Sequence, residues 1–278
     1  MTTLDFVWQA IVILLLWTGG TTICRAMDSG RAPVSFQTLL KKARHLYFAF
    51  PLLLALPSIN VYLATHPSLQ WDMPEWLQLH WAALSWGIVS GILAYVFGFC
   101  SAAALARSPR WRRAPIYFSV AVLAVIQIYA GWSSRPNLPP LGETRVSSDS
   151  VILQTTPYTC VPAAGANIAA ILGVHASEKE MVKLFHTTRD GTFPAQALHG
   201  LRELGIFGRK AKAGIEIGEV TPPAMLFILG DTHAVVYAGT SHGRIEILNP
   251  SVGKTWLSES QLRELWDGHA LEFMRAAN

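Results

Sequence analysis

Cys160 is the residue of this chain best placed to act as a nucleophile. It ends a polar loop and begins a run of small residues, Cys-Val-Pro-Ala-Ala-Gly-Ala, that favours a helix. At a helix N-terminus the dipole and the free backbone N–H groups favour the thiolate form of a cysteine. The other cysteines are Cys24 and Cys100, so no neighbouring cysteine completes a disulfide or a zinc site. The alternative is an ordinary buried cysteine.

Three polar residues elsewhere in the chain could complete a catalytic site around this thiol. His233 precedes an Ala-Val-Val-Tyr segment, and histidine, which titrates near neutral pH, suits a general base. Asn249 ends the next apolar segment and could orient the imidazole, the third role in a triad. Gln154 lies six residues before Cys160, and its side-chain N–H could join the Cys160 backbone N–H in an oxyanion hole. Taken singly, each also has an ordinary explanation, as a surface histidine, a turn asparagine or a loop glutamine.

The blocks that carry these residues resemble the C39 cysteine peptidases. They are Gln-x5-Cys-x-Pro-Ala-Ala at 154–164, Thr-His-Ala-Val-Val-Tyr at 232–237, and Ile-Leu-Asn-Pro-Ser-Val-Gly at 247–253. The family comprises papain-like domains known mainly from bacteriocin-processing ABC exporters, where they cut leader peptides after a Gly-Gly pair. The resemblance covers about residues 150–275. It implies that Cys160 is the nucleophile and His233 the base. Asn249 would then orient the base, and Gln154 would be the oxyanion donor.

Two positions depart from the family pattern, since Val161 stands where Gly is usual and Asn249 where Asp is usual. These changes leave open a catalytically inactive domain that binds a leader peptide or a secretion partner in the same groove. Acyl transfer to an acceptor other than water is a third hypothesis, because the same triad does both. The sequence contains no Gly-x4-Gly-Lys-Ser/Thr phosphate loop of a transporter. No cofactor is expected, and no metal site, because no His-rich ligand spacing appears.

The elements expected around these residues are helices first and then a sheet. An alanine-rich helix is predicted over Cys160–Leu172, with Thr159 as its N-cap. A capping box of Ser177 and Glu180 predicts a second helix, and Pro194–Leu204 is a third. Strands are predicted at Ile206–Lys212, Ala224–Leu229, His233–Ala238, Arg244–Leu248 and Ala270–Met274, with a helix at Ser258–Trp266. Helices followed by a mostly antiparallel sheet predict an α+β domain, which the resemblance identifies as papain-like.

The first 132 residues have the composition of membrane helices. Of the 18 Asp and Glu residues in the chain, only Asp5, Asp28, Asp72 and Glu75 fall in this part. Four apolar stretches reach the length of about 20 residues that crosses a bilayer. They are Phe6–Ile23, His45–Ala64, Leu79–Ala106 and Ala114–Trp132. We therefore expect an all-α transmembrane bundle of four helices over 1–132, a Pro- and Ser-rich linker over 133–149, and the C39-like domain over 150–278.

Basic residues in the predicted loops indicate the orientation in the membrane. All the Lys and Arg residues of the first 132 positions lie in the loops after the first and third spans, and residues 66–78 contain none. The prediction is an integral protein of a bacterial inner membrane whose C-terminal domain lies outside the cytoplasm. The expected partners are a peptide or protein substrate, the membrane, and a secretion or transporter partner. Nucleic acid is not expected, because the pI of 9.1 comes from these loops.

Overall fold

The structure is a computed structural model that describes residues 15–23, 55, 59, 62–63, 66, 68–107, 144–189 and 191–275. The chain divides into two compact units. The first comprises Met1–Tyr62 with His80–Ser134, and the second comprises Leu63–Leu79 with Arg135–Asn278. The second unit therefore combines the C-terminal half with a short segment from the first half of the sequence.

The first unit is helical where it is described. Residues 15–23 form a helix, and α5 extends over Glu75–Arg107 and begins in the second unit. The helix of residues 15–23 packs on α5 through Gly20 and Gly98, where an added Cβ would collide with the backbone of the facing helix. These glycines allow two helix backbones to approach closely.

The predicted transmembrane bundle is wrong, and so is the integral-membrane location. Among the residues that the structure describes, no helix has both the length and the apolar character needed to cross a membrane. The predicted span Leu79–Ala106 falls within α5, whose first turn instead belongs to the second unit, where the Gln78 side chain is buried. The span Ala114–Trp132 and most of Phe6–Ile23 and His45–Ala64 lie outside the described residues, as does the predicted linker up to residue 143.

The C-terminal domain is an α+β fold with an antiparallel sheet, as predicted. Its helices are α7 (Cys160–Ile171), α8 (Glu178–Leu184), α9 (Pro194–Arg202) and α10 (Glu259–Arg263), with a 3-10 turn at Ile217–Glu219. The six-stranded sheet has the order β3-β8-β4-β5-β6-β7, and every neighbouring pair is antiparallel. Its strands are β3 (Ile206–Lys210), β4 (Ala224–Ile228), β5 (His233–Ser241), β6 (Arg244–Asn249), β7 (Gly253–Leu257) and β8 (Trp266–Arg275). A separate two-stranded sheet pairs β1 (Arg145–Val146) with β2 (Ile152–Leu153).

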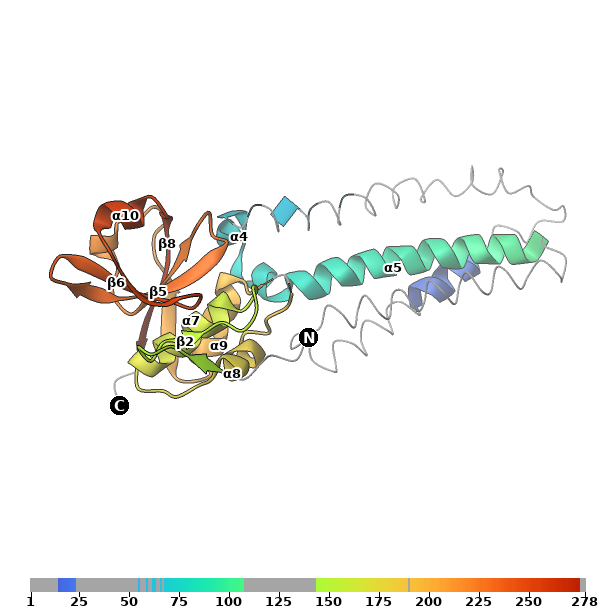
Figure 1. Cartoon of the computed structure of the whole chain (residues 1–278). Coiled ribbons are helices and arrows are strands. Elements are labelled where there is room, and N and C mark those ends of the chain that lie inside the picture. Colours follow the sequence, from blue (N-terminus) through green and yellow to red (C-terminus); the bar gives the residue numbers. More distant parts are fainter. Residues whose placement is uncertain are drawn as a thin grey trace. The chain divides into compact units, whose positions relative to one another are not determined.

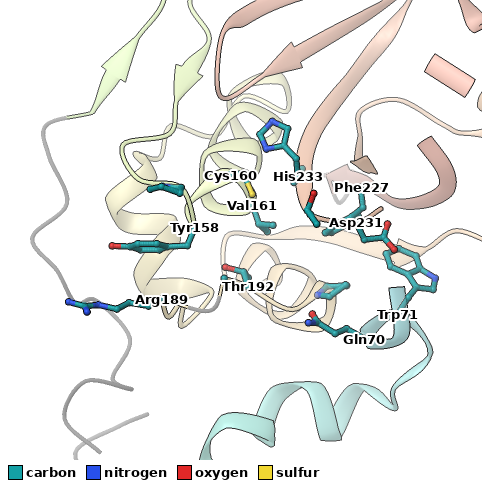
Figure 2. A pocket seen from close by; sticks show the side chains of 15 residues that line it. Gln70, Trp71, Tyr158, Cys160, Val161, Arg189, Thr192, Phe227, Asp231 and His233 are labelled. Atoms are coloured by element: carbon teal, nitrogen blue, oxygen red, sulfur yellow. The ribbon is translucent and has the colours of Figure 1, made fainter. Parts of the chain in front are cut away.

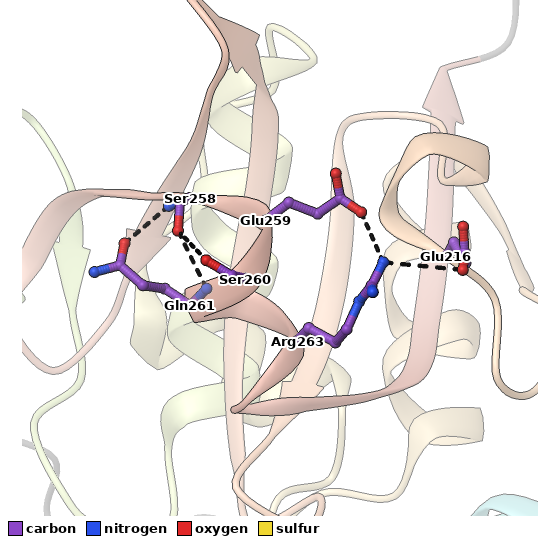
Figure 3. Close-up of polar contacts among 6 residues, drawn as sticks. All are labelled: Glu216, Ser258, Glu259, Ser260, Gln261 and Arg263. Carbon is purple, nitrogen blue, oxygen red and sulfur yellow. Dashed lines mark hydrogen bonds and ion pairs between the residues drawn. The ribbon is translucent and has the colours of Figure 1, made fainter.

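The helix starts follow from local capping chemistry. Ser177 and Glu180 form the predicted capping box at α8. Ser258 forms a second one with Gln261 at α10, as Figure 3 shows. The helix predicted there up to Trp266 ends early, at Arg263, which pairs with Glu259 at 2.9 Å. Sequence analysis missed β7 and the short helix α4 (Ser68–Asp72).

The sheet buries side chains on both faces, as the alternation along its strands requires. On β4, Met225 and Phe227 join the core beneath α7, α8 and α9 (Figure 1). The intervening Leu226 joins a second core on the other face, with Leu262 of α10. The small residues of α7 let that helix lie directly on β5. Cys160, at the start of α7, is thereby brought to the end of the sheet at which the inner strand β5 begins.

Asn167 holds the loop before the cysteine to α7. It is 2% exposed, and its amide accepts from Ile152 N at 2.8 Å and donates to Ile152 O and Ala163 O at 2.9 Å each. Replacing it with alanine leaves the backbone N–H and C=O of Ile152 without these partners, and each unsatisfied buried group costs about 1–3 kcal/mol. We expect Asn167→Ala to lower the free energy of unfolding by about 3 kcal/mol, measured by urea denaturation of the full chain. A loss below about 1 kcal/mol would contradict this assignment.

Candidate active site

Cys160 is the first residue of α7, in the place that sequence analysis gave it. The preceding turn is closed by Thr159, whose hydroxyl accepts from Thr156 N at 3.1 Å and donates to Thr156 O at 3.0 Å. Thr159 occupies the N-cap position, but its side chain makes no capping bond to α7. The predicted role of Thr159 is therefore corrected in one respect, since its hydroxyl stabilises the loop rather than the helix. The first backbone N–H groups of α7 stay available beside the thiol.

The thiol of Cys160 is buried, with 8% of the residue exposed. Burial raises the pKa of Cys160, and the backbone N–H groups of Ala234, Val161 and Cys160 itself lower it by less. The backbone donors thus favour the thiolate as expected, but desolvation of the charged form outweighs them. The same contributions place the sulfur next to the backbone of Ala234, the residue after His233.

His233 and Asn249 meet as predicted. His233 Nε2 lies 2.9 Å from Asn249 Oδ1, because His233 begins β5 and Asn249 ends the adjacent β6. The backbone N–H of Ser251 also donates to Asn249 Oδ1, at 2.9 Å, which fixes the oxygen end of the amide toward the histidine. An oxygen only accepts, so the neutral imidazole carries its proton on Nε2. Its Nδ1 then has a free lone pair that can take a proton.

Ser251 is a site residue that sequence analysis did not find. Its Oγ donates to Gln154 Oε1 at 3.2 Å and lies 3.5 Å from His233 Nε2. It therefore connects His233 to Gln154. The signal was present in the Asn-Pro-Ser order after β6, since a residue two positions after an asparagine is the usual donor to its side chain.

Gln154 lies close to this cluster but does not line the pocket beside Cys160. Its Nε2 donates to Thr156 O at 3.0 Å, and its backbone N–H donates to Pro250 O at 2.8 Å. An amide nitrogen carries two hydrogens, so one of the two at Nε2 stays available. The loop is also held by the buried carboxylate of Glu178, which accepts from Thr155 N at 2.8 Å.

Cys160 and His233 face one pocket of about 210 Å³, shown in Figure 2. It is bounded by the loop before α7, by the start of α9, and by β4 and the loop before β5. Side chains of several kinds line it, including Tyr158, Val161, Phe227 and Asp231. Gln70 and Trp71 of α4 also line it, although they lie about ninety positions before the cysteine. Groups of three or more His, Cys, Asp or Glu suited to a metal ion are absent from the described residues.

Comparisons with known proteins show to which proteins this domain is similar. The model of the Peptidase C39 family matches residues 148–278. An uncharacterized protein of Methanothermobacter marburgensis is 26% identical over 128 residues, which are 45% of this chain and 89% of that protein. A double glycine motif protease from an AMS/PCAT transporter, solved in complex with the leader peptide, is 18% identical with a TM-score of 0.42, over 51% of this chain and 99% of its own. The peptidase domain of Streptococcus ComA, a bi-functional ABC transporter, is 22% identical with a TM-score of 0.41, over 45% of this chain and 96% of its own. Residues 148–278 therefore match the Peptidase C39 family.

Proposed function

We propose that this domain is an active cysteine peptidase in which Cys160, His233 and Asn249 form the triad. The observation that carries the proposal is the bond from His233 Nε2 to Asn249 Oδ1, at the pocket that also contains Cys160. This bond leaves Nδ1 of His233 as the nitrogen for the thiol. A base oriented by a third group beside a nucleophile is the general arrangement of covalent catalysis.

The reaction follows from these positions. His233 Nδ1 takes the proton of the Cys160 thiol as Sγ attacks the peptide carbonyl carbon. The imidazolium then returns the proton to the leaving amine as the C–N bond breaks, and an acyl-enzyme thioester is left. Water attacks the thioester after His233 takes one of its protons, and the carboxylic acid and free thiol are released. Asn249 keeps the imidazole in the required tautomer through both steps.

The oxyanion of the tetrahedral intermediate would be stabilised at the start of α7. The Cys160 backbone N–H is one donor, because the first N–H groups of a helix have no partner within it. The remaining hydrogen of Gln154 Nε2 is the other, and Ser251 fixes that amide by donating to its Oε1. A small rotation of the Gln154 side chain would turn this hydrogen toward the pocket when substrate enters.

The substrate class we propose is a peptide with small residues before the scissile bond, such as a leader ending in Gly-Gly. The pocket volume of about 210 Å³ is below the ~300–1,000 Å³ of pockets for drug-sized ligands. Val161, which stands next to the nucleophile in place of the usual Gly, is one of the side chains that line this small pocket. The partner that we propose is an exporter, which would deliver such a leader peptide to the domain.

One observation favours a second function, a peptide-binding domain without catalysis. Cys160 is 8% exposed and its pKa is raised by burial, which opposes thiolate formation. In that case the groove would hold a peptide and the thiol would stay protonated. The two functions differ in whether His233 takes the proton of Cys160.

Alkylation of Cys160 by iodoacetamide distinguishes the active peptidase from the binding domain, and it requires no knowledge of the substrate. If His233 accepts the proton, the wild-type rate at Cys160 is already high at neutral pH. In His233→Ala the rate falls at neutral pH and rises only above the usual thiol range near about 8.5, because burial raises the pKa of Cys160. Mass spectrometry of the modified peptide distinguishes Cys160 from Cys100. Equal pH profiles in the two proteins would favour the binding domain.

A further inference from the structure

One wall of the catalytic pocket comes from outside the C39 match. The segment Leu63–Leu79 belongs to the compact unit of the C-terminal domain, and Gln70 and Trp71 line the pocket together with Cys160 and His233. The family model begins only at residue 148. We call residues 63–79 the wall segment.

Trp71 fixes the wall segment on the domain. It is 7% exposed, and its ring stacks on His269 of β8 with centroids 4.7 Å apart and planes 20° apart. Its edge contact with Phe227 of β4 has centroids 5.5 Å apart. Lys210 Nζ donates to Trp71 O at 2.9 Å and lies 5.3 Å from the ring centroid. A buried aromatic held on several sides is typical of an interface residue on which binding depends.

The other end of the wall segment contacts the start of α9. Gln78 is 1% exposed, and its Oε1 accepts from Ala195 N at 3.0 Å. This satisfies one of the backbone N–H groups that a helix start leaves unpaired. The Gln78 amide is itself held by donation from Nε2 to Met73 O at 2.7 Å. Pro194, next to Ala195, also lines the pocket, so the wall segment is fixed on two of the pocket's sides.

Charge complementarity also holds the wall segment in place. Burial lowers the pKa of Lys210, while Glu75 and Asp72 of the segment act to raise it. Asp72 likewise helps to raise the pKa of His269. The segment contains Asp72 and Glu75 and no Lys or Arg, so its net charge is opposite to that of Lys210.

The contacts continue from the wall segment to the loop that leads to His233. His269 Nδ1 lies 2.8 Å from Asp231 Oδ2, and this hydrogen bond is the main reason that the pKa of His269 is raised. Asp231 is 6% exposed and stands two residues before His233, on the loop that leads into β5. Figure 2 shows Trp71, Asp231 and Phe227 together at one side of the pocket.

From these contacts we infer that the wall segment positions the peptide substrate, with Gln70 and Trp71 as specificity-determining residues. The inference rests on the proposed peptidase activity. The peptide lies between the wall segment and Cys160, and the segment limits which side chains fit beside the scissile bond. On this side of the pocket Trp71 and Gln70 present aromatic and amide groups, and Asp231, which is paired with His269 through Oδ2, leaves its buried Oδ1 without a hydrogen-bond partner.

The test compares Trp71→Ala with Trp76→Ala in the full chain. Trp76 lies on the same segment, is 61% exposed and does not line the pocket. With a quenched-fluorescence peptide that contains a Gly-Gly pair, Trp71→Ala should lower kcat/KM by about 10–100-fold, mainly through KM, as loss of a buried aromatic contact does. Trp76→Ala should leave kcat/KM within about twofold of wild type. Gln70→Ala, which leaves the Trp71 contacts in place, should raise KM by a few-fold.

Iodoacetamide labelling of Cys160 distinguishes a failure of the wall-segment inference from a failure of the proposed peptidase activity. The reagent is too small to need the wall segment, so its rate should not fall in Trp71→Ala. Cleavage by wild type together with an unchanged KM in Trp71→Ala would overturn the wall inference and leave the peptidase intact. If Trp71→Ala loses labelling of Cys160 together with cleavage, Trp71 has a purely structural role, and the wall inference is overturned as well. A gain in kcat/KM in Trp71→Ala would show that the wall segment obstructs the pocket, and this result would also contradict the wall inference. Absence of wild-type cleavage with slow labelling would instead refute the proposed function.

Discussion

Cys160→Ala is expected to abolish peptide cleavage while the chain stays folded. Without Sγ no acyl-enzyme forms, and loss of a nucleophile in such triads typically lowers kcat by about 10⁴–10⁶-fold. Alanine fits the site, because the neighbouring positions of α7 are already occupied by small buried residues such as Ala163 and Ala164. The measurement is the initial rate on a quenched-fluorescence Gly-Gly peptide, with products identified by mass spectrometry.

Cys100→Ala is the matched control for this substitution. Cys100 is a partly exposed thiol of α5 in the other compact unit, and burial raises the pKa of its side chain as well. Removing it should leave cleavage unchanged. If Cys160→Ala retains the wild-type rate, the observed cleavage comes from another enzyme in the preparation or from another residue. If both variants bind the peptide and neither they nor wild type cut it, the binding function is favoured.

The places of the three proposed triad residues could be predicted from the sequence, because helix starts and strand ends leave local signals. Cys160 follows a polar loop and starts an alanine-rich helix, and the structure places it there. His233 and Asn249 stand at the joined ends of two adjacent strands, so the antiparallel register alone brings them together. The helices and most strands could be predicted from capping residues and from the spacing of apolar residues, which changes from that of a helix to that of a strand. Both signals depend on neighbours in the sequence.

The burial of the thiol and the wall segment both depend on contacts distant in sequence. The sequence left the burial as an alternative and gave no sign of the wall segment. Residues 66–78 contain no Lys or Arg, and this was interpreted as an exterior loop between membrane spans. The structure gives a different physical reason, since Asp72 and Glu75 in this segment face Lys210 of β3. The apolar run at Leu79–Ala106 was likewise assigned to a bilayer, yet α5 begins with a turn bound to α9 through Gln78.

His233→Ala is expected to reduce kcat/KM by about 10³-fold or more, because the thiol loses the group that takes its proton. Burial raises the pKa of Cys160, so neutral pH alone leaves the thiol protonated in this variant. The residual rate should therefore increase with pH as the thiolate forms. The measurement is kcat/KM for the Gly-Gly peptide from pH 6 to about 10, a range that includes the ordinary thiol pKa.

Substitutions of Asn249 and Ser251, the neighbours of His233, are expected to lower kcat/KM by smaller and unequal amounts. Asn249→Ala removes the acceptor of the His233 Nε2 proton and should cost about 10–100-fold, as loss of a single orienting hydrogen bond does. Asn249→Asp keeps an acceptor oxygen at this position and should retain most activity. Ser251→Ala removes the 3.2 Å bond from its Oγ to Gln154 Oε1 and a 3.5 Å contact to His233 Nε2, and it should cost a few-fold. Equal losses in all three would contradict the assignment of Asn249 as the residue that orients the base, because position 249 would then act through the fold rather than through its oxygen.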